Sequence, residues 1–165
     1  MLNKKMTDKF FVSILLLFLL QASPLLAGNI SIDEIRKEYP LAMQDKAVCI
    51  KWFDAFNNQV NTLDPILQAY KGGIYMGMAK FAVITKKVSY VNKGKTLIEE
   101  AILNDKNNIE IRFIRFSIQV KLPQVLGYNK STEEDKKFII SNIAMIKNDK
   151  FRNDILRFLK ENTAQ

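Results

Sequence analysis

Histidine is absent from all 165 residues of this sequence, and its absence removes a large part of enzyme chemistry. Without imidazole there is no Ser-His-Asp or Cys-His nucleophilic site, no histidine general base and no histidine-ligated metal. We therefore assign no catalytic residue, no cofactor and no metal site from the sequence.

Cysteine occurs only once, as Cys49, so the chain cannot form an internal disulfide bond and must be held together by packing. Cys49 lies between Val48 and Ile50 in a segment that we expect to be helical. The preferred interpretation is a buried, inert thiol, and the alternative is a thiol that pairs with another molecule.

The long apolar run at residues 10–20 is too short to span a bilayer. It follows a basic N-terminus and precedes Pro24 and the small residue Ala27, a pattern typical of a secretory signal peptide. We expect residues 1–27 to be the signal peptide and residues 28–165 to be a periplasmic or secreted protein. The alternative is an uncleaved membrane anchor.

Residues 28–165 are enough for a single domain with one core. Residues 1–27 hold three of the 25 basic and one of the 17 acidic side chains, so the remaining chain has a net charge of about +6. This charge is spread along the chain, which favours weak attraction to anionic surfaces. Export argues against nucleic acid as a partner.

Apolar residues recur at helical spacing and strand-like alternation is not sustained, so we predict an all-α fold of about six to seven helices. Ser31 and Ser131, each followed by a glutamate three residues later, predict helix starts with capping boxes. Asp64 before Pro65 predicts another start, with Asp64 as the N-cap. The expected helices cover residues of about 31–42, 44–57, 64–84, 91–103, 107–120, 131–146 and 151–159.

Small residues form a stripe in the helix expected at residues 64–84. Ala69, Gly73 and Gly77 are spaced four apart, so another helix can approach this face closely. The same glycines match a membrane dimer motif, but flanking lysines leave too short an apolar segment for it. We therefore predict close helix packing at this stripe.

The next segment, residues 86–95, carries four lysines and no acid. This pattern predicts a basic connection or an exposed helix start, and of the two we prefer a solvated loop. The alternative is a basic surface that contacts lipid headgroups or acidic polymers. The candidate residues of this surface are Lys86, Lys87, Lys93 and Lys95.

Two arginines interrupt the apolar pattern of the helix expected at residues 107–120. On a helical wheel Asn108, Arg112, Arg115 and Gln119 form one stripe, with isoleucine and phenylalanine on both sides of it. A helix that is apolar on two faces packs between neighbours, so the stripe faces internal carboxylates or a groove.

Both interpretations use the planar fork of arginine, which pairs bidentately with carboxylates. In the first, the arginines bridge to acids on neighbouring helices, and the candidates are Glu99, Glu100, Glu134 and Asp135. In the second, the stripe is the wall of a groove that holds an extended peptide or its carboxylate. The candidate ligand-binding residues are then Arg112, Arg115, Gln119 and Tyr128.

Residues 75–108 resemble one tetratricopeptide repeat, a 34-residue helix–turn–helix unit. The matching positions are Phe81, Ala82, Gly94, Ile98 and Ala101, while Thr85 and Lys106 depart from the pattern. This resemblance implies antiparallel helix pairs in a tetratricopeptide-like bundle. Residues 94–102, 109–119, 126–129 and 134–138 also resemble a family of small, exported, uncharacterised helical proteins of Bacteroidota-type bacteria, which implies location and fold but no activity.

Together these features predict an exported, non-enzymatic protein-binding or assembly module of the cell envelope, with a protein or peptide partner. One alternative is a small hydrolytic enzyme built on carboxylates such as Glu100 or Asp135. Another is an envelope-surface binder that uses the lysines of residues 86–95, whose binding would fall steeply with salt.

Overall fold

The computed structural model describes residues 29–59 and 64–162, so the signal peptide expected at residues 1–27 lies outside the described part. The described residues form seven α-helices and two short 3-10 helices and contain no strand, which confirms the all-α prediction. In chain order the elements are α2 (Ile32–Ala42), α3 (Lys46–Asn57), α4 (Pro65–Phe81), α5 (Ile84–Asn104), α6 (Ile109–Gln119), η1 (Gln124–Leu126), α7 (Thr132–Asn142), η2 (Ile143–Met145) and α8 (Asp149–Asn162).

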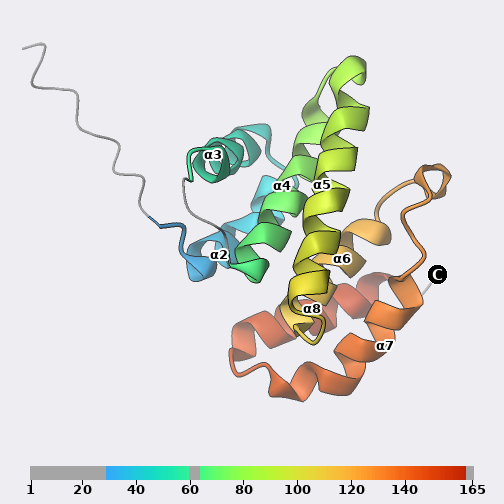
Figure 1. Cartoon of the computed structure of the whole chain (residues 1–165). Coiled ribbons are helices and arrows are strands. Elements are labelled where there is room, and N and C mark those ends of the chain that lie inside the picture. The colour runs from blue at the N-terminus through green and yellow to red at the C-terminus, as the bar shows by residue number, and fades with distance from the viewer. Residues whose placement is uncertain (1–28, 60–63, 163–165) are drawn as a thin grey trace, which may run out of the picture.

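Figure 1 shows α4 and α5 side by side in the middle of the molecule, with α2 and α3 to one side and α7 and α8 below. α6 lies between the α4–α5 pair and the lower helices. None of the described helices is both long and apolar enough to cross a lipid bilayer.

The three helix starts predicted from capping residues are at the right places, but only one is capped as expected. The Asp64 side chain accepts a hydrogen bond of 2.8 Å from the amide of Ile66, with Pro65 as the first helical residue. Ser31 and Ser131 occupy N-cap positions, yet neither side chain makes a capping bond within the described residues. The capping-box prediction is wrong at Ser131 because its backbone, at φ −98° and ψ 4°, lacks the extended conformation of a cap.

The boundary between α4 and α5 differs from the prediction. α4 ends at Phe81, and α5 begins at Ile84 and continues through the segment expected to be a basic loop. The preferred loop prediction for residues 86–95 is therefore wrong, and the alternative of an exposed helix start is confirmed. Lysine is a good helix former, and Val91 and Gly94 pack against the core, so tertiary contacts extend the helix through this segment.

The larger core lies between α2, α3, α4, α5 and one face of α6. Cys49 is fully buried in it, and its thiol lies 3.7 Å from the carbonyl oxygen of Ile74. Burial raises the pKa of the Cys49 thiol to about 11. The prediction of a buried cysteine is confirmed, and a thiol in this state stays protonated and unreactive at neutral pH.

The glycines of α4 allow its neighbours to approach closely, as predicted. A Cβ atom on Gly77 would lie 2.8 Å from the Cys49 sulfur, and one on Gly73 would overlap the Tyr39 ring. A second close approach was not predicted: Cβ atoms on Gly72 and Gly94 would each lie within 2.8 Å of the other residue's carbonyl oxygen. The backbones of α4 and α5 are therefore in direct contact at this crossing.

α6 packs on two faces, as the pattern of its apolar residues predicts. Its isoleucines Ile111, Ile114 and Ile118 belong to the larger core. On the other face Phe113 and Phe116 join a smaller core with α7 and α8. This leaves one narrow strip of α6 for the two arginines.

Candidate functional site

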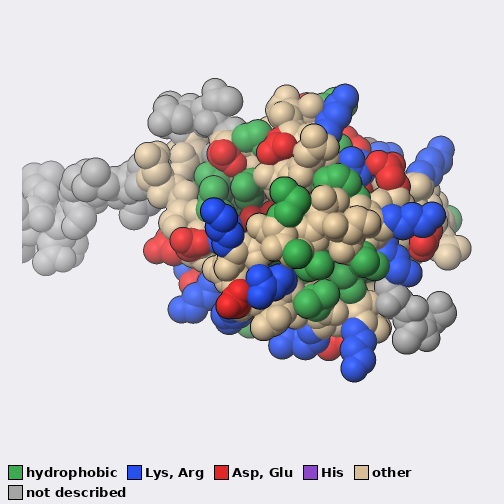
Figure 2. Space-filling view, turned by 90° about the horizontal axis from the view of Figure 1, so that it is seen from below, with side chains coloured by type: hydrophobic (Ala, Val, Ile, Leu, Met, Phe, Trp, Pro, Cys, Tyr) green, Lys and Arg blue, Asp and Glu red, His purple; other side chains and the backbone are tan. Residues whose placement is uncertain are grey.

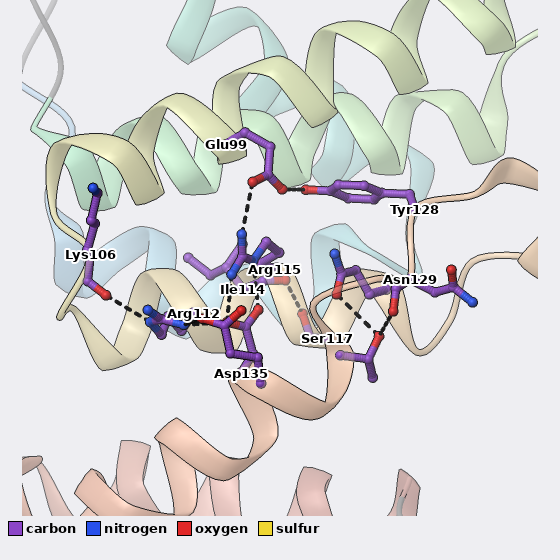
Figure 3. Close-up of polar contacts among 12 residues, drawn as sticks. Glu99, Lys106, Arg112, Ile114, Arg115, Ser117, Tyr128, Asn129 and Asp135 are labelled. Carbon is purple, nitrogen blue, oxygen red and sulfur yellow. Dashed lines mark hydrogen bonds and ion pairs between the residues drawn. The ribbon is translucent and has the colours of Figure 1, made fainter.

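Arg115 of α6 is at the centre of a network of buried charges (Figure 3). Its Nε and Nη2 atoms each donate a hydrogen bond to a different carboxylate oxygen of Asp135 on α7, and both bonds are 2.7 Å long. Its Nη1 atom donates to Glu99 of α5 over 2.9 Å. Arg115 is 5% exposed and Asp135 is 0% exposed, so this bidentate pair is removed from solvent.

Arg112 extends the same network by one helical turn. Its Nη1 atom donates to Glu134 over 2.9 Å and to Asp135 over 3.0 Å, and its Nε atom donates to the carbonyl oxygen of Lys106 over 2.8 Å. The guanidinium carbon lies 4.3 Å from the centre of the Phe138 ring. Asp135 thus accepts from both arginines.

The two other candidate ligand-binding residues lie beside this network. The Tyr128 hydroxyl donates to Glu99 over 2.7 Å, on the opposite oxygen from the one that Arg115 uses (Figure 3). The side-chain oxygen of Gln119 accepts a hydrogen bond of 3.2 Å from Thr132. The fold therefore brings all four predicted residues into one region, and each has a partner within the protein.

These contacts change the pKa values of three side chains in the network. Burial disfavours the charge on Arg115, but the hydrogen bonds and charges of Asp135 and Glu99 outweigh it, so the pKa of Arg115 is raised. Burial, and then the hydrogen bond to Glu99, raise the pKa of Tyr128. The hydrogen bond from Arg112 lowers the pKa of Glu134.

The interpretation of Arg112 and Arg115 as internal ion pairs is confirmed. Three of the four predicted acids take part, whereas Glu100 accepts instead from the side-chain amide of Gln68 over 2.8 Å. A ligand carboxylate at Arg115 would have to displace Asp135. The chemical effect of the arrangement is to join α5, α6 and α7.

A second network of the same kind has no clear sequence signal. Arg36 of α2 pairs bidentately with Glu110 of α6, with both hydrogen bonds at 2.9 Å, and the Tyr70 hydroxyl donates to the same carboxylate over 2.6 Å. Glu110 is buried although its side chain is charged. The hint available in the sequence is that Glu110 lies between two isoleucines, of which Ile111 is buried and Ile109 is partly buried.

The candidate basic residues all lie on α5. Lys86 and Lys87 are in its first turn, and Lys93 and Lys95 follow two turns later. The ammonium of Lys95 lies 5.2 Å from the centre of the Tyr128 ring. We call residues 80–88, where α4 and α5 join, the α4–α5 tip.

The α4–α5 tip also exposes large apolar side chains, which the sequence patterns did not single out. Val83 is 65% exposed, Ile84 78% and Val88 67%. In Figure 1 this end of the α4–α5 pair rises above the other helices at the top of the view. The tip therefore combines exposed apolar residues with lysines at a projecting part of the molecule.

The opposite face has a different character. Figure 2, which views the molecule from below, shows apolar side chains toward the middle of this face and both acidic and basic side chains around them. The exposed apolar residues of α7, η2 and α8 are Ile140, Met145 and Leu156. Charges of both signs are mixed on this face, unlike at the tip.

Within the described residues, no three side chains of the types that bind metals lie together as a metal site would require. Comparison of the chain with known protein families, with curated proteins and with solved structures finds no match.

Proposed function

We propose that the protein is an exported, non-enzymatic binding module of the cell envelope and that it contacts its partner through the α4–α5 tip. The observation that carries this proposal is the exposure of Val83, Ile84 and Val88 together at one end of the molecule. Contiguous exposed apolar side chains rimmed by polar residues are typical of interaction sites.

The lack of a polar cap at the start of α5, which lowers local stability at the tip, supports this proposal. Val83 is the N-cap of α5 and, among the described residues, has no side-chain capping bond. The N-caps of α4 and α6, Asp64 and Asn108, both accept hydrogen bonds from the helix. An apolar cap costs about 1 kcal/mol relative to a polar one. Departures from local preference of this kind are expected where a residue serves binding.

The charge networks support the proposal from another direction. The carboxylates considered for hydrolytic chemistry already have partners, since Glu99 and Asp135 pair with arginine and Glu100 with Gln68. The arginine pairs of Glu99 and Asp135 connect α5, α6 and α7. The exposed apolar side chains of the tip lie away from these carboxylates, near the start of α5.

The proposal includes export through a signal peptide at residues 1–27 and antiparallel pairing of successive helices, as in tetratricopeptide-like proteins. Contacts of α2 with α3, α4 with α5 and α6 with α7 support this pairing. The turn at residues 82–83 falls inside the first helix of the 75–108 repeat frame. We therefore keep the pairing of helices in the proposal but not that repeat register.

The test is sedimentation with envelope fragments, using protein purified from the cell after export. We expect the wild type to sediment with the fragments and an Ile84→Ser, Val88→Ser variant to lose affinity by about tenfold or more, because apolar burial at the contact is lost. The matched control is Leu103→Ser, since Leu103 is 66% exposed at the other end of α5. Circular dichroism checks that all variants remain helical.

Every variant carries the same N-terminus, so any contribution of residues 10–20 cancels in the comparison. Equal sedimentation of the wild type, the tip variant and the control would contradict the proposal.

A further inference from the structure

Charge of a single sign fills the part of the chain that forms α4 and most of α5. Between Asp64 and Glu99 the sequence contains no acidic residue, although it contains six lysines. These are Lys71, Lys80, Lys86, Lys87, Lys93 and Lys95. None of them forms an ion pair with a carboxylate of the described residues.

Two of these lysines donate hydrogen bonds, and in both cases the acceptor is uncharged. The Nζ atoms of Lys71 and Lys80 donate to backbone carbonyl oxygens, over 3.0 and 3.1 Å respectively. Burial, and then the positive charge of Lys93, lower the pKa of Lys71. Positive charge in this region is therefore concentrated and not neutralised.

The arginines of this chain behave in the opposite way. All five form ion pairs with aspartate or glutamate: Arg36, Arg112, Arg115, Arg152 and Arg157. Arg36, Arg112 and Arg115 connect helices through their ion pairs, whereas the lysines of α4 and α5 have no carboxylate partner within the described residues.

The apolar residues of the tip continue a stripe that begins in the core. Val91 packs at the edge of the larger core. Val88 and Ile84 lie three and seven residues before it, so they share its face of α5. Because they are 67% and 78% exposed, the stripe leaves the core and ends in solvent. An exposed apolar stripe of this kind is typical of an interaction site.

We infer, building on the proposed function, that the partner of the α4–α5 tip is the surface of an anionic lipid bilayer. Val83, Ile84 and Val88 enter the boundary between headgroups and acyl chains, and Lys86 and Lys87 contact the lipid phosphates. Apolar residues at the end of a projection with lysines beside them match the layers of a bilayer, since lysine stems extend toward headgroups while apolar tips enter deeper.

The shape and charge of the tip favour lipid over a protein groove. A bilayer surface accepts a convex projection without a complementary cavity, and its negative potential attracts unneutralised lysines. Each lysine near such a surface strengthens binding by about fivefold at moderate ionic strength. The acid-free stretch removes the repulsion that carboxylates would add.

The first test is vesicle flotation with the exported protein. We expect binding to vesicles that contain phosphatidylglycerol and little binding to vesicles of phosphatidylcholine alone. Ile84→Ser with Val88→Ser should weaken binding by about tenfold or more. Lys86→Gln with Lys87→Gln should weaken it similarly and reduce its salt dependence.

Matched controls carry the same chemical changes away from the tip. Leu103→Ser removes an exposed apolar side chain at the other end of α5. Lys150→Gln with Lys160→Gln removes two positive charges from α8, where both residues are exposed. We expect both controls to bind anionic vesicles nearly as the wild type does.

A second measurement reports the depth of the tip directly. Trp52 is the only tryptophan and is buried in the core, so an added tryptophan reports its own surroundings. We expect the fluorescence of Ile84→Trp to shift to shorter wavelength on anionic vesicles, and that of Leu103→Trp to stay unchanged.

Three outcomes would overturn the inference. Binding to anionic vesicles that is unaffected by Ile84→Ser with Val88→Ser would show charge adsorption without entry of the tip. A dimer that Ile84→Ser converts to monomer in sedimentation velocity would assign the tip to a second copy of the chain. Absence of wild-type vesicle binding, with envelope sedimentation still dependent on Ile84 and Val88, would leave the proposed function standing with a protein partner.

Discussion

Asp135 joins α7 to α6 through one carboxylate, and Arg115 continues the connection to Glu99 of α5. It has no exposure to solvent, it accepts both hydrogen bonds of the Arg115 fork, and it also accepts from Arg112. Taking these charges out of water is costly, and only their mutual pairing offsets that cost. The pair therefore contributes little net stability relative to apolar residues, but loss of one partner leaves a buried charge uncompensated.

We predict that Asp135→Asn lowers the free energy of unfolding by about 3–5 kcal/mol, because Arg115 loses its buried bidentate carboxylate and keeps only the partly exposed Glu99. Urea denaturation followed by circular dichroism measures this change. The matched variant is Glu134→Gln, on the next residue and paired with Arg112, but 66% exposed at its side chain. It should cost about 0–1 kcal/mol. Equal losses for the two variants would show that burial does not set the energy of this network.

At the scale of helices, the crossing of α4 and α5 depends on two glycines. A Cβ on Gly94 would lie 2.7 Å from the backbone oxygen of Gly72, and backbone cannot move aside as a flexible side chain can. Two effects with opposite signs therefore compete at Gly94. Alanine in a helix is favoured over glycine by about 1 kcal/mol, while overpacking costs about 1–3 kcal/mol.

We predict that overpacking wins and that Gly94→Ala destabilises the protein by about 1–2 kcal/mol, despite the gain in helix propensity. Thermal unfolding measures the sign of the effect. Asn92→Ala, two residues earlier on the exposed side of α5, should instead stabilise the protein by a few tenths of a kcal/mol, roughly, through propensity alone. Stabilisation by Gly94→Ala would mean that α4 and α5 can separate at no cost.

At the scale of the whole molecule, three buried tyrosines make the free energy of unfolding depend on pH. Burial is the main cause that raises the pKa of Tyr39, Tyr70 and Tyr128, and nearby carboxylates add to it for the last two. In the unfolded chain these hydroxyls titrate near the ordinary value of about 10. Above that pH the unfolded state binds fewer protons than the folded state, so stability falls as pH rises.

We therefore predict a lower urea midpoint at about pH 11 than at about pH 8, with stability from these tyrosines fully present below about pH 10. Tyrosinate absorbance should show Tyr39, Tyr70 and Tyr128 ionising together with unfolding. Tyr128→Phe should reduce the slope of stability against pH, since it removes one of the linked protons. A urea midpoint that is the same at both pH values would contradict this linkage.

Several features of the fold follow from the sequence because they depend on neighbours within a few residues. The two apolar faces of α6 are visible in its helical periodicity, and the cap at Asp64 is set by Pro65 beside it. The pairing of Arg112 and Arg115 with acids follows from the same pattern, since a charge between two apolar faces needs a partner.

Other features depend on partners that are distant in sequence, and only the tertiary structure decided them. Arg36 meets Glu110 across 74 positions, and the capping bonds predicted at both serines do not form. The helix through residues 86–95 exists because α5 packs against α4, although its lysines alone favour solvent. Periodicity determines which face of a helix is apolar. The exposure of Val83, Ile84 and Val88 depends instead on where the neighbouring helices end, and that is decided by contacts between residues that are distant in the sequence.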